Sequence, residues 1–557
     1  MPDLRYEKIQ ALIIDDFDSF RDMLFLMLQQ LGVPKIDVAG SGAEGLRLCS
    51  INTYDIILCD QNLGPGKSGQ QVLEVLRHTT NNNSDSLFVL ISAESNKNII
   101  MASFDHEPDD YLTKPITTQS LEQRLDRLLT QRLALTPIFK ALKNAKFDAA
   151  IDLCRTEIVG NQRYKNYCQK LLGNLLLKME YLDDAEQLYR GILEVRQLDW
   201  AMLGMANVKK SKGDSLSAQQ WLEEIIQFNP LCLKAYDVLA EILRERDDTA
   251  ALQLLLQQAL EYSPLSILRQ QALGEVALQN NDIETAAVAF RKAVKLGENS
   301  YYDNLNCLIN FVRSIIQLSV FDKTMAKSML RDAMKSVSDL PSRFGKNIDT
   351  KVSSHLLEVQ LQVACGDAKK SKEAMSAANT LIEKEKTSLA LWTKIEWVSA
   401  LRAMGNVAEA ERITAELLSE YSSSEEDLQK IDHLLDEPSS AKNKKFVSKT
   451  NKEGIAFYEA KDFSHAALLF KRALQKLPKH IGLRLNLLQT LIELLKTDQG
   501  NSLISDEAQQ IVYGVASSIP ANHKQYQRFR QLEAAVKDVI NGVSATKGRA
   551  HNNQALL

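Results

Sequence analysis

The stretch Ala11-Leu-Ile-Ile-Asp-Asp16 is a short apolar run that ends in two carboxylates. Similar apolar runs follow at 54–58 and 87–91, and stretches with the apolar spacing of helices, such as 19–31 and 43–50, lie around and between them. Short apolar strands that alternate with helices predict a parallel sheet covered by helices on both faces. The first part of the chain is therefore expected to be a doubly wound five-stranded α/β domain.

Polar residues stand at the carboxyl ends of these strands. Asp15 and Asp16 end the first strand and Asp60 the third. Ser92 ends the fourth, and Lys114 follows a short fifth segment. Ligands of such sheets bind beyond the carboxyl ends, so these side chains should converge on one edge.

This convergence suggests phosphoryl chemistry. Carboxylates held close together either take up protons or hold a hard cation, and oxygen ligands suit Mg²⁺. Asp60 could then accept a phosphoryl group, with Ser92 and Lys114 donating to its oxygens. Acidic residues at strand ends can also simply cap turns or helices, an alternative that the carboxylates alone leave open.

The residues at this edge resemble, in order and spacing, the receiver domain of two-component response regulators. The resemblance covers about residues 6–132, and we place the domain at 1–132 with a flavodoxin-like fold. It is carried by Asp15-Asp16, Asp60, Ser92-Ala93, Tyr111 and Lys114-Pro115.

The resemblance implies a role for each matching residue. In the family, an acidic pair and the acceptor carboxylate hold Mg²⁺, while a hydroxyl and a lysine bind the phosphoryl group. Carried over, the roles are metal binding by Asp15, Asp16, Asp60 and the backbone carbonyl of Asn62, phosphate acceptance by Asp60, phosphoryl binding by Ser92 and Lys114, a rotamer switch by Tyr111, and tuning of dephosphorylation by Asn62 and Glu94.

The loop after the acceptor departs from the family pattern. It runs Asp60-Gln-Asn-Leu-Gly-Pro-Gly-Lys-Ser-Gly69, one residue longer than usual. We therefore expect a different loop shape, although no acceptor group is lost. Gly66-Lys67-Ser68 looks like the end of a phosphate-binding P-loop, but Gln61 stands where that motif requires glycine.

A small apolar residue recurs after the first domain at a nearly constant interval. Its spacings are 35, 33, 34 and 34, and it stands within stretches of helical periodicity at Ala150, Ala185, Ala218, Leu252 and Ala286. A period of 34 with two helices per unit resembles the tetratricopeptide repeat, in which stacked neighbours bury each helical pair. This part is therefore expected to be an all-α superhelical solenoid.

The clearest unit is 266–293, with Gly274 and Ala286 allowing close helix approach and Phe290 filling the gap beyond. Related sets recur as Gly173, Ala185 and Tyr189, and as Gly454, Ala466 and Phe470.

We predict repeats over 137–440 and 450–540, about nine or ten helical pairs, and a disordered tail over 541–557. No long linker separates the receiver from the array. The basic residues at 442, 444, 445, 449 and 452 lie in a polar stretch that we interpret as a solvated linker between helical segments.

Composition supports this organisation. The chain has 557 residues with only 23 Gly and 12 Pro, about half the usual share, and most of the shortage falls in the array. No apolar run reaches the roughly 18 residues of a membrane helix, and no secretory signal is evident, so we expect a cytoplasmic protein without membrane insertion. A net charge of −4 and the absence of a basic face argue against nucleic-acid binding.

The combination predicts a phosphorylation-dependent response regulator. Asp60 would take phosphate from a histidine kinase or phosphotransfer protein, and the array would bind a protein or peptide in its groove. A second copy of the chain is a further candidate partner. No catalytic constellation is seen outside the receiver, so enzymatic activity beyond self-phosphorylation and self-dephosphorylation is not expected. The alternative is a phosphorylation-independent scaffold or kinase inhibitor that uses the receiver for docking.

Overall fold

The computed structural model describes residues 6–79, 85–93, 108–160, 162–385, 389–497, 502–516, 519 and 521–554. The chain forms two compact units. The first comprises Met1–Val276 with Val288–Leu308, and the second comprises Ala277–Ala287 with Ile309–Leu557. The domain limits predicted from the sequence, at 132 and near 440, stay predictions.

The first unit begins with a five-stranded parallel sheet, which confirms the predicted fold class. Its strand order is β2-β1-β3-β4-β5, so the chain winds outward in both directions from β1 and β3. The strands are β1 (Gln10–Ile14), β2 (Lys35–Ala39), β3 (Ile56–Asp60), β4 (Leu87–Ser92) and β5 (Asp110–Thr113).

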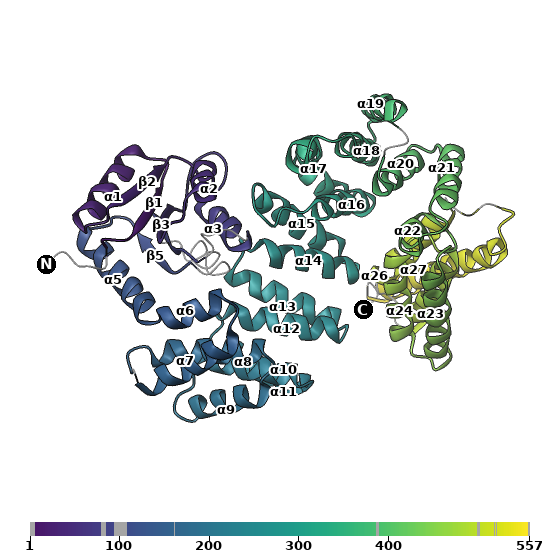
Figure 1. Cartoon of the computed structure of the whole chain (residues 1–557). Coiled ribbons are helices and arrows are strands. Elements are labelled where there is room, and N and C mark those ends of the chain that lie inside the picture. The colour runs from purple at the N-terminus through teal and green to yellow at the C-terminus, as the bar shows by residue number, and fades with distance from the viewer. Residues whose placement is uncertain are drawn as a thin grey trace. The chain divides into compact units, whose positions relative to one another are not determined.

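Helices cover both faces of this sheet (Figure 1). Leu24 of α1 (Asp18–Gln30) and Leu125 of α5 (Thr118–Ala134) pack in the core on one face. Residues of α2 (Gly42–Ile51) and α3 (Gly69–His78) pack in the core on the other face. β1 and β3 are almost wholly buried between these two cores, as the apolar runs predict.

Consecutive helices follow α5, within the same unit except for residues 277–287. From the first of these helices to α13 (Thr249–Tyr262), each packs on its neighbour, and α8 also contacts α10, as α10 contacts α12. The helices are α6 (Thr136–Lys143), α7 (Phe147–Gly160), α8 (Lys165–Lys178), α9 (Leu182–Leu193), α10 (Asp199–Ser211), α11 (Ser215–Phe228), α12 (Leu233–Glu245), α13 (Thr249–Tyr262), α14 (Ile267–Gln279) and α15 (Ile283–Gly297).

The second unit continues the helical pattern. Helices α17 to α19 and α20 to α27 again pack in sequence, and α18 contacts α20 as α25 contacts α27. The helices are α16 (Leu305–Phe321), α17 (Lys323–Phe344), α18 (Ile348–Ala364), α19 (Ala368–Glu385), α20 (Leu391–Ala403), α21 (Val407–Glu420), α22 (Glu425–Ile431), α23 (Ala441–Glu459), α24 (Phe463–Lys476), α25 (Ile481–Thr497), α26 (Ser502–Ala516) and α27 (Tyr526–Gln554).

The close helix approach predicted at glycine positions is confirmed. A Cβ atom on Gly274 would lie 2.7 Å from the Phe290 ring, and one on Gly454 would lie 2.4 Å from Phe470. Phe290 and Phe470 are both almost fully buried. An aromatic ring on one helix thus occupies the space that glycine leaves on another, as the repeat pattern predicts.

A left-handed residue recurs in the turns of the array with the same spacing as the small residues. Residues with φ between 54° and 81° follow each other at intervals of 35, 33, 34 and 34. In each turn the next residue's N–H bonds to a carbonyl five residues back, which ends the helix in a Schellman motif. The left-handed positions are Ala145, Glu180, Gly213, Asp247 and Asn281.

Only one of these five positions is glycine, which explains part of the glycine shortage. A left-handed conformation costs about 1 kcal/mol or more for a residue with a Cβ atom. Asp214, Asp248 and Asp282 directly follow such positions, and the last two, which follow Asp247 and Asn281, offset part of this cost. Each accepts a hydrogen bond from a backbone N–H three residues on, at 3.1 to 3.2 Å.

We therefore expect Glu180→Gly to stabilise the array by about 1 kcal/mol, because glycine adopts a φ of 59° without a steric penalty. The reciprocal change Gly213→Ala should destabilise it by a similar amount. Urea unfolding followed by circular dichroism measures both. Destabilisation by Glu180→Gly, as for glycine inside a helix, would contradict the proposed strain.

The C-terminal part corrects the expectation of a solvated basic linker. The basic residues at 442, 444, 445, 449 and 452 lie on α23, not between helices. Asp432, fully buried, accepts hydrogen bonds from the backbone N–H of Ser439 at 2.6 Å and from the Asn443 side chain at 2.8 Å. Ser440 caps the helix. These hydrogen bonds fix the start of α23. The helix lies in a polar stretch of sequence, so its helical periodicity is not evident from the sequence.

Helix α27 continues to Gln554, and the disordered tail predicted over 541–557 stays a prediction.

Candidate functional site

The predicted acceptor residues stand together at one edge of the sheet. Asp60 is the last residue of β3 and Ser92 the last of β4, while Asp15 directly follows β1 and Lys114 directly follows β5. Parallel pairing aligns these strand ends, with Asp60 beside Ile91 and Ser92 beside Thr113. The predicted convergence at the carboxyl edge is therefore found in the structure.

Lys114 joins the two buried carboxylates of this edge. Its Nζ lies 2.7 Å from Asp60 Oδ1 and 3.0 Å from Asp15 Oδ2. The same ammonium lies 3.8 Å from the centre of the Phe20 ring. Asp15 is 1% exposed and Asp60 6%. Two carboxylates thus approach one cation in a largely dehydrated position.

Burial raises the pKa of Asp60 above its ordinary value, while Lys114 and the backbone N–H of Asn62 oppose this rise. That N–H donates to Asp60 Oδ2 at 3.0 Å. Burial alone would lower the pKa of Lys114, but its bonds to Asp60 and Asp15 outweigh burial and raise it. Lys114 is thus ion-paired with Asp60 and Asp15. A further cation or an incoming anion would rearrange these pairs.

The other predicted residues differ in their placement. Asp16 is exposed at the end of β1, Ser92 is 4% exposed, and Tyr111 of β5 is half-buried against the core that includes Cys59. The backbone carbonyl of Ser92 accepts from the N–H of Lys114 at 2.8 Å, which ties the ends of β4 and β5 together. Glu94 lies outside the described residues.

The sequence pattern did not single out Phe20 and Arg21, two residues of α1 near the acceptor. Phe20 packs against the Lys114 ammonium, and the Arg21 guanidinium donates to the backbone carbonyl of Asp15. Both belong to the amphipathic stretch that follows Asp15-Asp16, so only their closeness to that pair could have marked them.

The loop between Asp60 and α3 packs tightly on the acceptor. A Cβ atom on Gly69 would lie 2.1 Å from the carbonyl oxygen of Asp60, so only glycine fits. The Gly69 N–H donates to the Gln61 carbonyl at 3.1 Å. Ser68 and Gln71 then form a capping box at the start of α3. Movement of the loop is thus coupled to the acceptor strand and to α3.

The carboxylates at this edge fit a magnesium ion by their chemistry. Their oxygens are the ligands that Mg²⁺ prefers, and two of them already surround one positive charge. In the described residues, no group of three His, Cys, Asp or Glu side chains stands at metal-binding distances. Asp16 would therefore have to turn toward Asp15 and Asp60 for the predicted set to act together.

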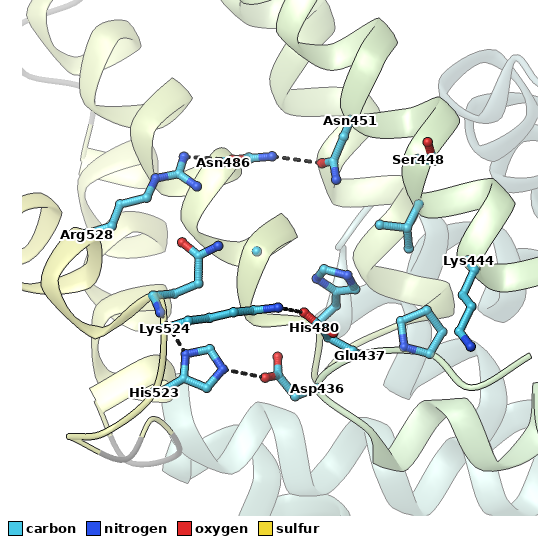
Figure 2. Close-up of a pocket in the computed structure, with 14 residues that line it drawn as sticks. Asp436, Glu437, Lys444, Ser448, Asn451, His480, Asn486, His523, Lys524 and Arg528 are labelled. Carbon is cyan, nitrogen blue, oxygen red and sulfur yellow. Dashed lines mark hydrogen bonds and ion pairs between the residues drawn. The ribbon is translucent and has the colours of Figure 1, made fainter.

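A cavity of about 470 Å³ lies among the C-terminal helices (Figure 2). Asn451 of α23, Asn486 of α25 and Arg528 of α27 line it. The Arg528 guanidinium donates to Asn486 Oδ1 at 2.7 Å, and the Asn486 amide donates to Asn451 Oδ1 at 2.8 Å. A guanidinium can only donate hydrogen bonds, so Asn486 must turn its carbonyl oxygen toward Arg528 and its NH₂ group toward Asn451. Asn451 then accepts with its own carbonyl oxygen, and its NH₂ group is the donor at the end of this chain of hydrogen bonds.

The charges around this cavity are unevenly paired. Asp436 contacts His523 at 2.8 Å, and Glu437 pairs with Lys524. Burial lowers the pKa of Arg528, and this guanidinium forms no ion pair with a described residue. The cavity therefore holds one partly dehydrated cation whose partners are neutral amides.

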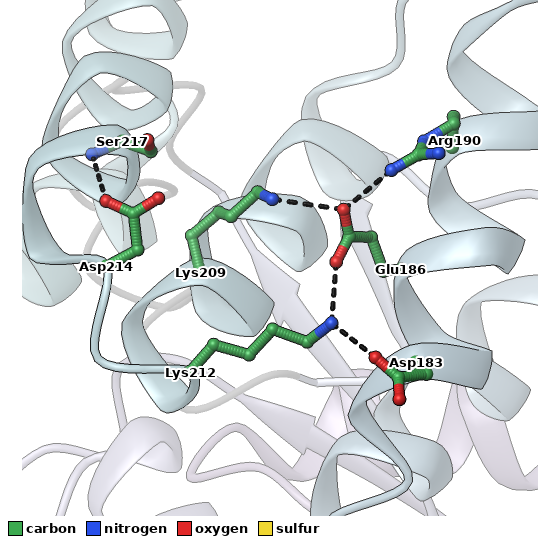
Figure 3. Close-up of polar contacts among 7 residues, drawn as sticks. All are labelled: Asp183, Glu186, Arg190, Lys209, Lys212, Asp214 and Ser217. Carbon is green, nitrogen blue, oxygen red and sulfur yellow. Dashed lines mark hydrogen bonds and ion pairs between the residues drawn. The ribbon is translucent and has the colours of Figure 1, made fainter.

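A second polar cluster links neighbouring helices of the first unit (Figure 3). Glu186 of α9 accepts from Lys212 at 2.7 Å and from Lys209 at 3.0 Å, and pairs with Arg190 at 2.7 Å. The bonds from Lys212 and Lys209 lower the pKa of Glu186 to about 2. Lys212 also contacts Asp183. The cluster fixes the end of α10 to α9 and so has a structural role.

Comparison with known proteins identifies the first domain. Residues 11–126 match the family model of the response regulator receiver domain. The chemotaxis protein CheY-3 of Vibrio cholerae is 28% identical over 123 residues, which is 22% of this chain and 92% of that protein.

Solved structures match both parts of the chain. A CheY-like receiver domain from Methylobacillus flagellatus is 32% identical, with 21% of this chain and 97% of that one covered and a TM-score of 0.20. A tetratricopeptide repeat protein from Parabacteroides merdae is 16% identical, with 53% and 98% covered and a TM-score of 0.32. In the described residues, no helix combines the length and apolarity needed to cross a membrane.

Proposed function

The N-terminal domain is a response regulator receiver domain, and all-helical repeats with tetratricopeptide-like structural neighbours follow it; from this premise we propose that the protein is a phosphorylation-dependent response regulator whose array acts through protein contacts. Asp60 accepts the phosphoryl group. The observation that supports this most strongly is the buried Asp60 carboxylate at the end of β3, with the Lys114 ammonium 2.7 Å away.

The transfer forms an acyl phosphate. An Asp60 carboxylate oxygen attacks phosphorus, the bond from phosphorus to a histidine nitrogen of a kinase or phosphotransfer protein breaks, and that nitrogen keeps the electron pair. Lys114 then turns from the Asp60 carboxylate to an oxygen of the phosphoryl group. The Ser92 hydroxyl donates to another.

Bound Mg²⁺ would neutralise the charge that gathers on the phosphoryl oxygens. Asp15, Asp16, Asp60 and the backbone carbonyl of Asn62 would hold it. We propose that Ser92 and Tyr111 carry the conformational change, and that Asn62 and Glu94 set the lifetime of the acyl phosphate. The array is the output. The connection between the receiver and the array is short, because α6 begins directly after α5.

The cavity of the C-terminal helices is our candidate binding site for a partner. Its Arg528 guanidinium has only neutral amide partners among the described residues, so an acidic group of a protein would be stabilised there. The Asn451 NH₂ group offers a further donor beside it.

The experiment that tests this function is phosphorylation of the full chain with acetyl phosphate and Mg²⁺. We expect intact-mass spectrometry to record the gain of a single phosphoryl group, carried by a peptide that contains Asp60. Absence of this gain, in a protein whose circular dichroism shows it to be folded, would favour the scaffold alternative, in which the receiver serves only for docking.

A further inference from the structure

Receiver helix α3 makes a specific contact with a distant segment of the chain. The segment 298–302 follows α15 and belongs to the same compact unit as the receiver. Receiver residues 71, 74 and 78 contact it and share one face of α3, since they are three and four residues apart. Lys67, in the loop after the acceptor, joins them through its ammonium, which donates to the backbone carbonyl of Asn299.

Glu74 is the centre of this contact. Its side chain is 1% exposed, although it lies on the surface of a helix in the receiver. Glu74 Oε2 accepts the Ser300 hydroxyl at 2.5 Å and the Tyr301 backbone N–H at 3.2 Å. Burial of a carboxylate is costly unless charged hydrogen bonds replace its water. Segment 298–302 supplies these hydrogen bonds to Glu74. The contact therefore depends on the carboxylate of this residue.

His78 and Gln71 extend the contact on both sides of Glu74. The His78 ring stacks on Tyr301 with centroids 4.5 Å apart and planes 3° apart. His78 Nε2 also lies 2.6 Å from the Tyr302 hydroxyl. The Gln71 amide donates to the carbonyl of Glu298 at 2.9 Å. Four receiver side chains thus engage five consecutive residues.

The segment is in turn tied to the array. The carbonyl of Tyr302 accepts a hydrogen bond from Gln271 of α14 at 3.1 Å. A displacement of 298–302 therefore also acts on this helix.

The receiver side of the contact reaches directly to the acceptor. Lys67 belongs to the lengthened loop after Asp60, and Gln71 belongs to the capping box of α3. Gly69, between them, packs on the Asp60 carbonyl with no room for a side chain. Because Asp60 is paired with Lys114 here, the contact occurs in the unphosphorylated arrangement of the site.

We propose that segment 298–302 is an intramolecular latch that holds the receiver in its unphosphorylated arrangement through α3, and that phosphorylation of Asp60 releases it. The proposal rests on the proposed function and adds the route by which the receiver and the array communicate. Coupling between two sites is reciprocal. If phosphorylation opens the latch, opening the latch must favour phosphorylation.

The test uses the full chain with Ser300→Ala, which leaves the Glu74 carboxylate buried without its hydroxyl donor. Its matched control is Glu298→Gln in the same segment, since Glu298 contributes its backbone carbonyl to the contact. With acetyl phosphate and Mg²⁺, we expect Ser300→Ala to be phosphorylated about fivefold faster than the wild-type protein, at the lower end of typical coupling between sites. Glu298→Gln should match the wild-type rate.

Hydrogen exchange gives a second readout. Residues 69–78 should exchange faster in Ser300→Ala, and also in the wild-type protein with beryllium fluoride, which mimics the acyl phosphate. Equal phosphorylation rates for Ser300→Ala and wild type would overturn the latch and leave the proposed function intact. Failure of both proteins to take a phosphoryl group would contradict both proposals. Unchanged exchange of α3 with beryllium fluoride would contradict release.

Discussion

Asp60→Asn is expected to abolish phosphorylation of the full chain by acetyl phosphate. The amide cannot form an acyl phosphate, and loss of a nucleophile typically lowers a rate by about a thousandfold or more. Intact-mass spectrometry after incubation with Mg²⁺ measures the fraction modified. Chelation of Mg²⁺ should reduce wild-type modification strongly as well, since the charge on the phosphoryl oxygens would not be neutralised.

The control for this variant is Asp85→Asn, an exposed aspartate that precedes β4. It should be modified like the wild-type protein. Because Asn keeps the size of the side chain, Asp60→Asn should remain folded by circular dichroism. Full modification of Asp60→Asn would contradict the proposed acceptor and direct attention to another carboxylate.

Gly204→Ala is expected to destabilise the array by about 3 kcal/mol, an overpacking effect. A Cβ atom on Gly204 would lie 2.2 Å from the Tyr189 ring, which is 1% exposed. The ring has no space to retreat, because a Cβ atom on Gly173 would lie 2.3 Å from the Tyr189 hydroxyl. Tyr189 is thus held between two glycines of neighbouring helices.

The matched control is Gly191→Ala on α9. No atom lies within 4 Å of a Cβ at Gly191, so alanine there should stabilise the helix by about 0.5–1 kcal/mol. Urea unfolding followed by the helical signal compares the two variants. Equal stability of Gly204→Ala and Gly191→Ala would contradict the close packing that defines the repeat.

The strand ends and the repeat spacing could be predicted from the sequence because each depends on local patterns. An apolar run that ends in Asp15 or Asp60 marks both a buried strand and a polar edge. A repeat every 34 positions indicates paired helices that approach closely, as the helices of Gly274 and Phe290 do in the structure.

Other features depend on partners that local patterns do not reveal. The basic surface of α23 conceals its helical periodicity in the sequence. The buried Asp432, which accepts a hydrogen bond from Asn443 of this helix, lies outside the helix itself. Local patterns do not reveal the left-handed turns, because Glu180 and Asp247 occupy them without a glycine. Glu74 looked like an ordinary surface residue of α3, since Ser300 is 226 positions away in the sequence.

We propose that phosphorylation at Asp60 is transmitted to the array. Hydrogen exchange of the full chain, with and without acetyl phosphate and Mg²⁺, tests this most directly, with Asp60→Asn as the reference for non-specific effects. We expect faster exchange in the wild-type protein at 298–302 and in helices of the array, and no such change in Asp60→Asn. Changes confined to residues 1–132 in a fully phosphorylated protein would contradict it.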